Sequence, residues 1–218
     1  MLQRVGVAMV AAGGVLAAAW LGGCANGSAA GVRSRAVRIE RAGVVTMRGM
    51  PLTLEGNTPA VGAKAPGFTA VANDMSTFTF APGGGEGGGG EHAKVWIISA
   101  VPSLDTPVCS LETRTFNEDA AKLGPDVRVL TVSMDLPFAQ KRWCGAEGIK
   151  HVMTVSDYRD RAFGKAYGLR IKENGLLARA VFVVNAQGVI TYEQIVPELA
   201  HQPDFGAVLA AARQAAGS

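Results

Sequence analysis

The sequence predicts an α/β domain in which a central mixed β-sheet is flanked by helices, with a β-hairpin at its N-terminal end. Three observations support this fold class. From residue 95 onward, short apolar runs rich in β-branched residues alternate with helical segments, which is typical of strand–helix–strand units. Two pairs of alternating runs joined by turn residues indicate antiparallel hairpins. The 218 residues are 48% hydrophobic and 18% charged, which is enough apolar material for one sizeable core.

The first 23 residues have the features of an export signal rather than of a folded segment. Arg4 precedes an apolar run from Val5 to Leu21, and small residues follow. The end of the run, Leu21-Gly22-Gly23-Cys24, resembles a bacterial lipobox, in which the cysteine is lipidated and becomes the first mature residue. We therefore expect a lipoprotein signal peptide at residues 1–23 and a membrane-anchored lipoprotein, attached through Cys24 and facing the periplasm or the cell exterior. An uncleaved membrane anchor is the alternative, because the run is nearly long enough to span a bilayer.

Residues 24–43 are expected to form a flexible tether, and residues 44–218 the folded domain. The tether is rich in Ala, Gly and Ser and shows no hydrophobic periodicity. Its arginines suit either a solvated linker or contact with anionic lipid head groups. The net charge of +3 is too small and too dispersed to indicate a nucleic-acid partner.

The domain begins with two short alternating runs from Val44 to Gly56, which predict a β-hairpin interrupted at Gly49 and Pro51. A further alternating run extends to Phe80. The glycines at 83–90 predict a flexible loop. They do not form a phosphate-binding loop, because no Gly-Lys-Ser/Thr sequence or helix follows them.

The remaining elements alternate between strand and helix. Strand 95–101, a helix from Thr106 to about Leu123 and strand 127–133 form a parallel strand–helix–strand unit. A strand at 151–157 and a helix ending at Gly168 follow. A hairpin turning at 185–188 and a closing helix at 204–216 complete the domain. This order matches a thioredoxin-like fold.

Cys109 occupies a chemically distinctive position, just after the buried strand 95–101. Thr106 is a natural helix N-cap and Pro107 suits the first helical position, so Cys109 falls in the first turn. Free backbone N–H groups and the positive end of the helix dipole favour a thiolate there. The alternative is that Cys109 is only a small buried hydrophobic residue.

Two motifs resemble those of a known family. Pro102, Thr106 and Cys109 form the P-x-x-x-T-x-x-C pattern of peroxiredoxins, and the stretch from Ser133 to Cys144 is similar to the signature of the bacterial thiol peroxidase subfamily. The resemblance runs from about Val44 to Arg213. It implies a thioredoxin-like fold and a thiol-dependent peroxidase that reduces hydrogen peroxide and organic hydroperoxides.

The resemblance also implies roles for individual residues. Cys109 is the peroxidatic cysteine, Cys144 the resolving cysteine, and the two form an intramolecular disulfide after local unwinding of their helices. The Thr106 hydroxyl and Arg179 are expected to donate hydrogen bonds to the peroxide, and Pro102 to shield the sulfur from water. An external dithiol, a thioredoxin-like protein, is the expected reductant, and a homodimer is implied.

Arg179 stands between Ala178 and Ala180 at the start of an apolar strand. A charge there is costly unless it is paired, so we expect a partner for it. The alternative is an edge arginine that reaches into solvent.

Other functions fit less well. A thioredoxin-like thiol–disulfide carrier would need closely spaced cysteines, whereas Cys109 and Cys144 are 35 residues apart (144 − 109). A binding module with a structural Cys109–Cys144 bond is a third possibility. No cofactor or metal is expected, because His92, His151 and His201 lack ligand spacing.

Overall fold

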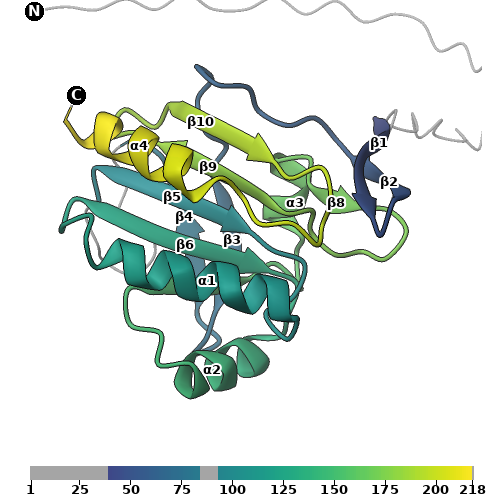
Figure 1. Ribbon diagram of the computed structural model, residues 1–218, viewed down its shortest axis with the longest axis horizontal. Helices are drawn as coiled ribbons and strands as arrows, with labels where there is room; N and C mark the ends of the chain where they lie inside the picture. The colour runs from purple at the N-terminus through teal and green to yellow at the C-terminus, as the bar shows by residue number, and fades with distance from the viewer. Residues whose placement is uncertain (1–38, 84–92, 218) are drawn as a thin grey trace, which may run out of the picture. The chain divides into compact units, whose positions relative to one another are not determined.

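The computed structural model describes residues 39–83 and 93–217, which fall within one compact unit. They form a seven-stranded sheet with the order β10-β9-β5-β6-β7-β3-β4 and a three-stranded sheet with the order β1-β2-β8 (Figure 1). The expected signal peptide, Cys24 and glycines 84–90 lie outside the described residues. In the part of the chain that is described, no helix combines the length and the apolar character needed to cross a membrane.

Most of the expected strands and helices are present, with differences in their bounds. The strands are β1 (Glu40–Met47), β2 (Met50–Glu55), β3 (Phe68–Ala72), β4 (Thr77–Phe80), β5 (Val95–Ala100), β6 (Val127–Ser133), β7 (Val152–Ser156), β8 (Arg170–Ile171), β9 (Ala180–Val184) and β10 (Ile190–Ile195). The helices are α1 (Pro107–Ala120), α2 (Pro137–Ala146), α3 (Ala162–Ala166) and α4 (Phe205–Ala216).

The large sheet is mixed, as the sequence predicts. Strands β5, β6 and β7 are parallel, and β9, β10, β3 and β4 continue the sheet in antiparallel pairs. Helix α1 connects β5 to β6 and makes this crossover the expected strand–helix–strand unit. The arrangement places the carboxyl end of β5 beside the beginning of α1, where Cys109 lies.

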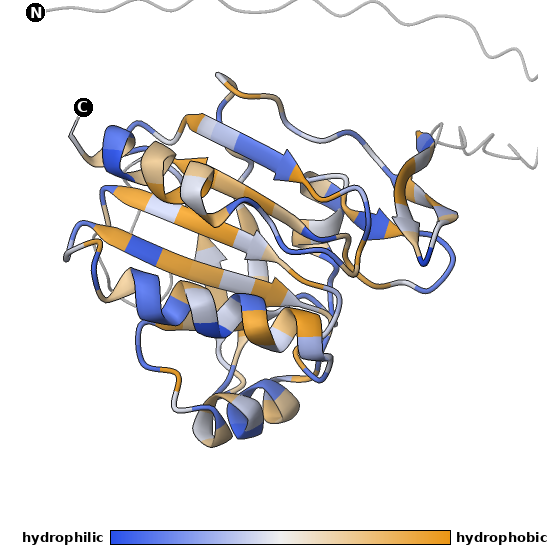
Figure 2. Ribbon diagram, in the orientation of Figure 1, coloured by the Kyte–Doolittle hydropathy of each residue, from blue (hydrophilic) through white to orange (hydrophobic). Residues whose placement is uncertain are grey.

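Both faces of the large sheet are buried, which explains the continuous apolar runs in its central strands (Figure 2). Along β5, Val95 and Ile97 pack toward α1 and α4, while Trp96 and Ile98 pack toward the face that α3 covers. Phe116 of α1 meets Phe205 edge-on, with ring centroids 5.0 Å apart. The two helices therefore share one apolar layer above the strands that carry the site.

The N-terminal hairpin is confirmed, but it begins earlier than expected. Strand β1 starts at Glu40, which pairs with Glu55, so the tether expected at 24–43 ends before this strand. Arg41 donates hydrogen bonds to the carbonyls of Gly56 and Gly168 and is thus not a free linker arginine. The sequence gives little sign of this strand because the Ala and Gly at 42–43 interrupt its alternation.

Two helices are shorter than expected, and one strand is additional. Helix α1 ends at Ala120 rather than near Leu123, and α3 covers only Ala162–Ala166. Strand β8 has two residues and pairs with β2. A strand this short forms through its tertiary partner and leaves no periodic pattern in the sequence.

Asp157, directly after β7, is a buried carboxyl that caps α3. Its two oxygens accept hydrogen bonds from the backbone N–H groups of Phe163 (3.0 Å) and Gly164 (2.8 Å). Burial raises the pKa of Asp157 to about 6, although these N–H groups oppose the rise. The native state therefore holds a proton at Asp157 over a pH range in which the unfolded chain releases it.

We predict that this carboxyl makes the protein less stable as the pH rises from about 4 to about 6. The folded pKa lies above the unfolded value of about 3.9, so the stabilising contribution is complete below pH 4 and is lost by pH 6. The loss amounts to about 2 to 3 kcal/mol at 1.36 kcal/mol per pKa unit.

Urea unfolding at several pH values measures this slope in the wild type and in Asp157→Asn. The variant carries no titratable proton there and should show a flatter profile. An equally steep decline in both proteins would contradict the assignment.

Candidate active site

Cys109 lies in the first turn of α1, as expected, and its side chain is 1% exposed. Pro107 begins the helix and Thr106 is its N-cap residue. The Thr106 side chain makes no capping hydrogen bond, however, because its hydroxyl donates to the carbonyl of Ser103 at 2.8 Å. The single hydroxyl proton is thus engaged, so Thr106 presents a lone pair rather than the donor that we expected.

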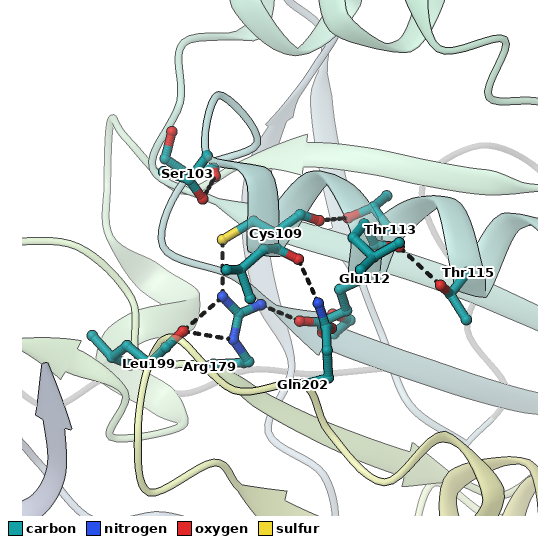
Figure 3. Close-up of polar contacts among 12 residues, drawn as sticks. Ser103, Cys109, Glu112, Thr113, Thr115, Arg179, Leu199 and Gln202 are labelled. Carbon is teal, nitrogen blue, oxygen red and sulfur yellow. Dashed lines mark hydrogen bonds and ion pairs between the residues drawn. The ribbon is translucent and has the colours of Figure 1, made fainter. Parts of the chain in front are cut away.

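Arg179 brings a positive charge directly to the sulfur. It immediately precedes β9, is 1% exposed, and donates from Nη2 to the Sγ atom of Cys109 at 3.2 Å (Figure 3). Its Nε and Nη2 groups also donate to the carbonyl of Leu199, at 3.1 and 2.9 Å. The contact distinguishes Cys109 from an inert buried thiol, since a cationic hydrogen-bond donor lies against its sulfur.

The expected partner of Arg179 is Glu112. Its Oε2 atom accepts from Nη1 of Arg179, and its Oε1 atom accepts from the Ser99 hydroxyl at 2.7 Å. Both members of this ion pair are buried, so the alternative of an edge arginine reaching into solvent is wrong. The pair joins α1, β5 and the start of β9 through one network.

The network keeps the guanidinium charged despite its burial. Burial alone would lower the pKa of Arg179, but the adjacent Glu112 and Cys109 outweigh it and raise that pKa. Burial raises the pKa of Glu112, while the Arg179 charge and the Ser99 hydroxyl oppose the rise. Arg179 can therefore present a fixed cation to the sulfur in a site of low dielectric constant, where such a charge acts strongly.

Pro102 lies at the start of the loop between β5 and α1 and is buried. The same loop is tied to the connection after β6 by Asp135. Its carboxylate accepts from the Ser103 hydroxyl at 2.6 Å and from the backbone N–H of Leu104 at 2.7 Å. The Ser133 hydroxyl donates to it at 2.7 Å. Asp135 thereby links the segment that carries Cys109 to the segment that leads to Cys144.

Cys144 lies in α2 and is a free, half-buried thiol, whereas Cys109 is a free, buried one. Its Sγ atom is 3.3 Å from the Thr154 hydroxyl, which accepts a hydrogen bond from Asn73. Burial raises the pKa of Cys144, with Thr154 opposing. Cys144 packs against the small apolar cluster that contains Cys109 and Trp143. The structure is therefore that of the dithiol form, in which the Cys109 sulfur contacts Arg179 and the Cys144 sulfur contacts Thr154.

Sequence reasoning missed Glu112, Asp135, the Leu199 carbonyl and Gln202. Glu112 could have been found, because Cys109, Glu112, Thr113 and Phe116 are spaced as one buried helix face. Gln202 donates to the carbonyl of Val108 at 2.9 Å, next to the cysteine (Figure 3). A backbone carbonyl such as that of Leu199 leaves no signal in the sequence.

Comparisons with known proteins identify the family of this chain. The family model described as Redoxin matches residues 60–209. The thiol peroxidase of Halalkalibacterium halodurans is 52% identical over 171 residues, which cover 78% of this chain and 98% of that protein. The thiol peroxidase of Bacillus subtilis is 48% identical over 169 residues, which cover 78% of this chain and 96% of the relative.

Solved structures confirm the thioredoxin-like fold. A peroxiredoxin-like protein from Aquifex aeolicus is 40% identical, with a TM-score of 0.70, over 81% of this chain and 98% of its own. A thiol peroxidase from Chromobacterium violaceum, 21% identical, shares the fold with a TM-score of 0.65 over 75% of this chain and 91% of its own. Since a buried cysteine with an arginine partner stands where the family motifs predict it, and since the relatives match along nearly their whole length, the chain belongs to the Redoxin family and, within the peroxiredoxins, to the thiol peroxidases.

Proposed function

We propose that Cys109 is the peroxidatic cysteine and Cys144 the resolving cysteine of a thiol-dependent peroxidase that acts on hydrogen peroxide and organic hydroperoxides. The observation that carries this proposal is the 3.2 Å contact between the Arg179 guanidinium and the Cys109 sulfur. It places a nucleophile and a cationic hydrogen-bond donor side by side. These are the two groups that cleavage of an O–O bond needs.

In the first step, the Cys109 thiolate attacks the terminal peroxide oxygen. An S–O bond forms, the O–O bond breaks, and the oxygen that leaves as hydroxide or alkoxide takes up a proton to give water or an alcohol. Cys109 becomes a sulfenic acid. Arg179 stabilises the negative charge that shifts onto the oxygens, and Thr106 accepts the hydrogen bond of the peroxide O–H group.

In the second step, the Cys144 thiol attacks the Cys109 sulfenic acid, forming a disulfide and releasing water. Burial raises the pKa of the Cys144 thiol, with Thr154 opposing the rise, and the Thr154 contact helps to hold the side chain in α2. Two contacts fix α2 against α1: the Trp143 indole N–H donates to Ser110 at 3.3 Å, and Arg114 pairs with Glu147 at 3.0 Å. Local unwinding of α2 must break these weak contacts before the sulfurs can bond.

An external dithiol, a thioredoxin-like protein, then reduces the disulfide by thiol–disulfide exchange and returns the enzyme to the dithiol form. If the domain is exported, this reductant must itself lie outside the cytoplasm. The homodimer implied by the resemblance stays a prediction. The alternative of a thiol–disulfide carrier lacks the closely spaced cysteines that such a protein exchanges.

We predict different effects of the two cysteine substitutions on the reaction with peroxide. Cys109→Ser should abolish the first turnover, because serine has no thiolate. Cys144→Ser should oxidise at a rate near that of the wild type but stop as a sulfenic acid. Stopped-flow peroxide consumption by the reduced proteins measures the first effect, and trapping with a sulfenic-acid reagent measures the second.

Two outcomes would contradict the proposal. Equal first-turnover rates in wild type and Cys109→Ser would reject the enzyme. A Cys109–Cys144 bond that resists mild reductant, and whose loss unfolds the protein, would instead favour the structural-disulfide module.

We also propose that residues 1–23 are a lipoprotein signal peptide and that lipidated Cys24 anchors the enzyme, facing the periplasm or the cell exterior. The support is the apolar run and the lipobox-like end described above. A cysteine that carries several acyl chains holds a protein at a membrane far more firmly than a single acyl chain does.

We predict that Cys24→Ala shifts the protein from the membrane fraction, because the acceptor of the lipid is lost. Fractionation of bacterial cells that express each form, with metabolic labelling by a fatty acid, is the measurement. Label and membrane association that persist in Cys24→Ala would contradict the anchor.

A further inference from the structure

The connection between β10 and α4, residues 196–204, covers the active site from one side. The Leu199 carbonyl accepts both the Nε and the Nη2 hydrogen bonds of Arg179. Three residues later, Gln202 holds the carbonyl of Val108, the neighbour of Cys109. The position of this connection thus helps to determine, together with Glu112, where the guanidinium points.

The opposite side of the connection is fixed by the N-terminal hairpin (Figure 1). The Glu198 carboxylate accepts hydrogen bonds from the Thr46 hydroxyl at 2.8 Å, from the Arg48 N–H at 3.0 Å and from the Gly49 N–H at 3.1 Å. Backbone hydrogen bonds reinforce the contact: Thr46 donates to Pro197 at 2.6 Å, and Leu199 donates to Thr46 at 2.9 Å. Glu198 therefore supplies the side-chain part of the contact between the hairpin and the connection that carries the Leu199 carbonyl.

The hairpin turn is shaped to present these donors. Met47 pairs with Met50, so Arg48 and Gly49 form the turn, with φ angles of 53° and 75°. Glycine tolerates this left-handed conformation, but arginine does so at a cost and persists in it only where the surroundings hold it. The Glu198 carboxylate, which receives both N–H groups of the turn, supplies that constraint.

We propose that Glu198 is a positioning residue of the peroxidase, through which the β1–β2 hairpin sets the Leu199 carbonyl and so aims Arg179 at the Cys109 sulfur. This inference rests on the proposed function of Cys109 and Arg179. The chain of contacts runs from the Gly49 N–H to Glu198, from the adjacent Leu199 carbonyl to Arg179, and from Arg179 to Cys109.

Small displacements along this chain matter because Arg179 must meet the peroxide at hydrogen-bond distance in the transition state. A shift of about 1 Å in a positioned catalytic group can cost up to about a hundredfold in rate. The Gly49 and Arg48 N–H groups and the Thr46 hydroxyl lower the pKa of Glu198 to about 2, the Gly49 group most strongly. Glu198 is therefore an anion at every pH at which the enzyme works, and the contact does not switch.

The test compares Glu198→Gln with Glu173→Gln. The two carboxylate oxygens of Glu198 accept the N–H groups of Arg48 and Gly49 separately. A glutamine amide has one oxygen and one NH₂ group, so Glu198→Gln keeps an acceptor at only one of these two positions. Glu173 is a matched control: its carboxylate accepts the Thr53 N–H at 3.0 Å and so holds the same hairpin at the other strand, away from residues 196–204. Both variants loosen the hairpin, but only Glu198→Gln weakens its contact with the connection behind Arg179.

The readout separates positioning from stability. In Glu198→Gln, we expect the first-turnover oxidation of Cys109 by peroxide to slow by about tenfold or more. The reduction of the Cys109–Cys144 disulfide by a small dithiol, in which Arg179 has no peroxide oxygen to stabilise, should change much less. Glu173→Gln should keep both rates. Thr46→Val, which removes one of the hydrogen bonds to Glu198, should slow oxidation in the same direction but less.

Three results would overturn the proposal. The first is a folded Glu198→Gln protein that oxidises at the wild-type rate, and the second is an equal slowing in Glu173→Gln. The third is an equal slowing of oxidation and dithiol reduction, which would mark a general structural defect. Each result can be told apart from a failure of the proposed function. That failure would appear as equal first-turnover rates in the wild type and Cys109→Ser, two proteins in which Glu198 is unchanged.

Discussion

The site depends on one buried cation, the Arg179 guanidinium, held between the Glu112 carboxylate and the Cys109 sulfur. A guanidinium with 1% exposure is stable only where anions and carbonyls satisfy its donors, and here Glu112 and the Leu199 carbonyl do so. The fold supplies each partner from a different place: α1 carries the cysteine and the carboxylate, and the connection after β10 carries the carbonyl. The large sheet holds Arg179, α1 and the connection after β10 together. Strand β9, which follows Arg179, pairs with β10 on one side and with β5 on the other, and β5 leads into α1.

The two cysteines differ in what surrounds their sulfurs. The Cys109 sulfur contacts a cation that the core keeps in place, whereas Cys144 lies in α2, where burial raises the pKa of its thiol and the Thr154 hydroxyl contact opposes the rise. Helix α2 lies outside the rigid sheet and is attached to α1 by a long indole hydrogen bond and a partly exposed ion pair. The structure is therefore more stable around Cys109, where the peroxide is cleaved, and less stable at α2, where the chain must move.

Much of the fold could be predicted from the sequence because the central strands are buried on both faces and are rich in β-branched residues, as in "VWIISA" and "VRVLTVS". The strand β8 and the early start of β1 could not, because both strands form by pairing with β2 rather than from a local pattern. Within the site, the motif residues Pro102, Thr106 and Cys109 were readable, and so was the need for a partner to Arg179. Glu112 could be identified as that partner only once the buried face of α1 was known. Leu199 acts through its backbone carbonyl, which the sequence does not mark. The direction of the Thr106 hydroxyl was mistaken, because a side chain at an N-cap position can bond outside the helix.

The most direct test of this account is the first-turnover rate of Cys109 oxidation in Arg179→Lys. Lysine keeps the charge opposite Glu112 but is a point donor that cannot contact the sulfur, the carboxylate and the Leu199 carbonyl together. The account predicts a folded protein whose oxidation by peroxide is slower by about a hundredfold or more, the scale of losing a fixed transition-state donor. A folded Arg179→Lys protein that oxidises as fast as the wild type would contradict it.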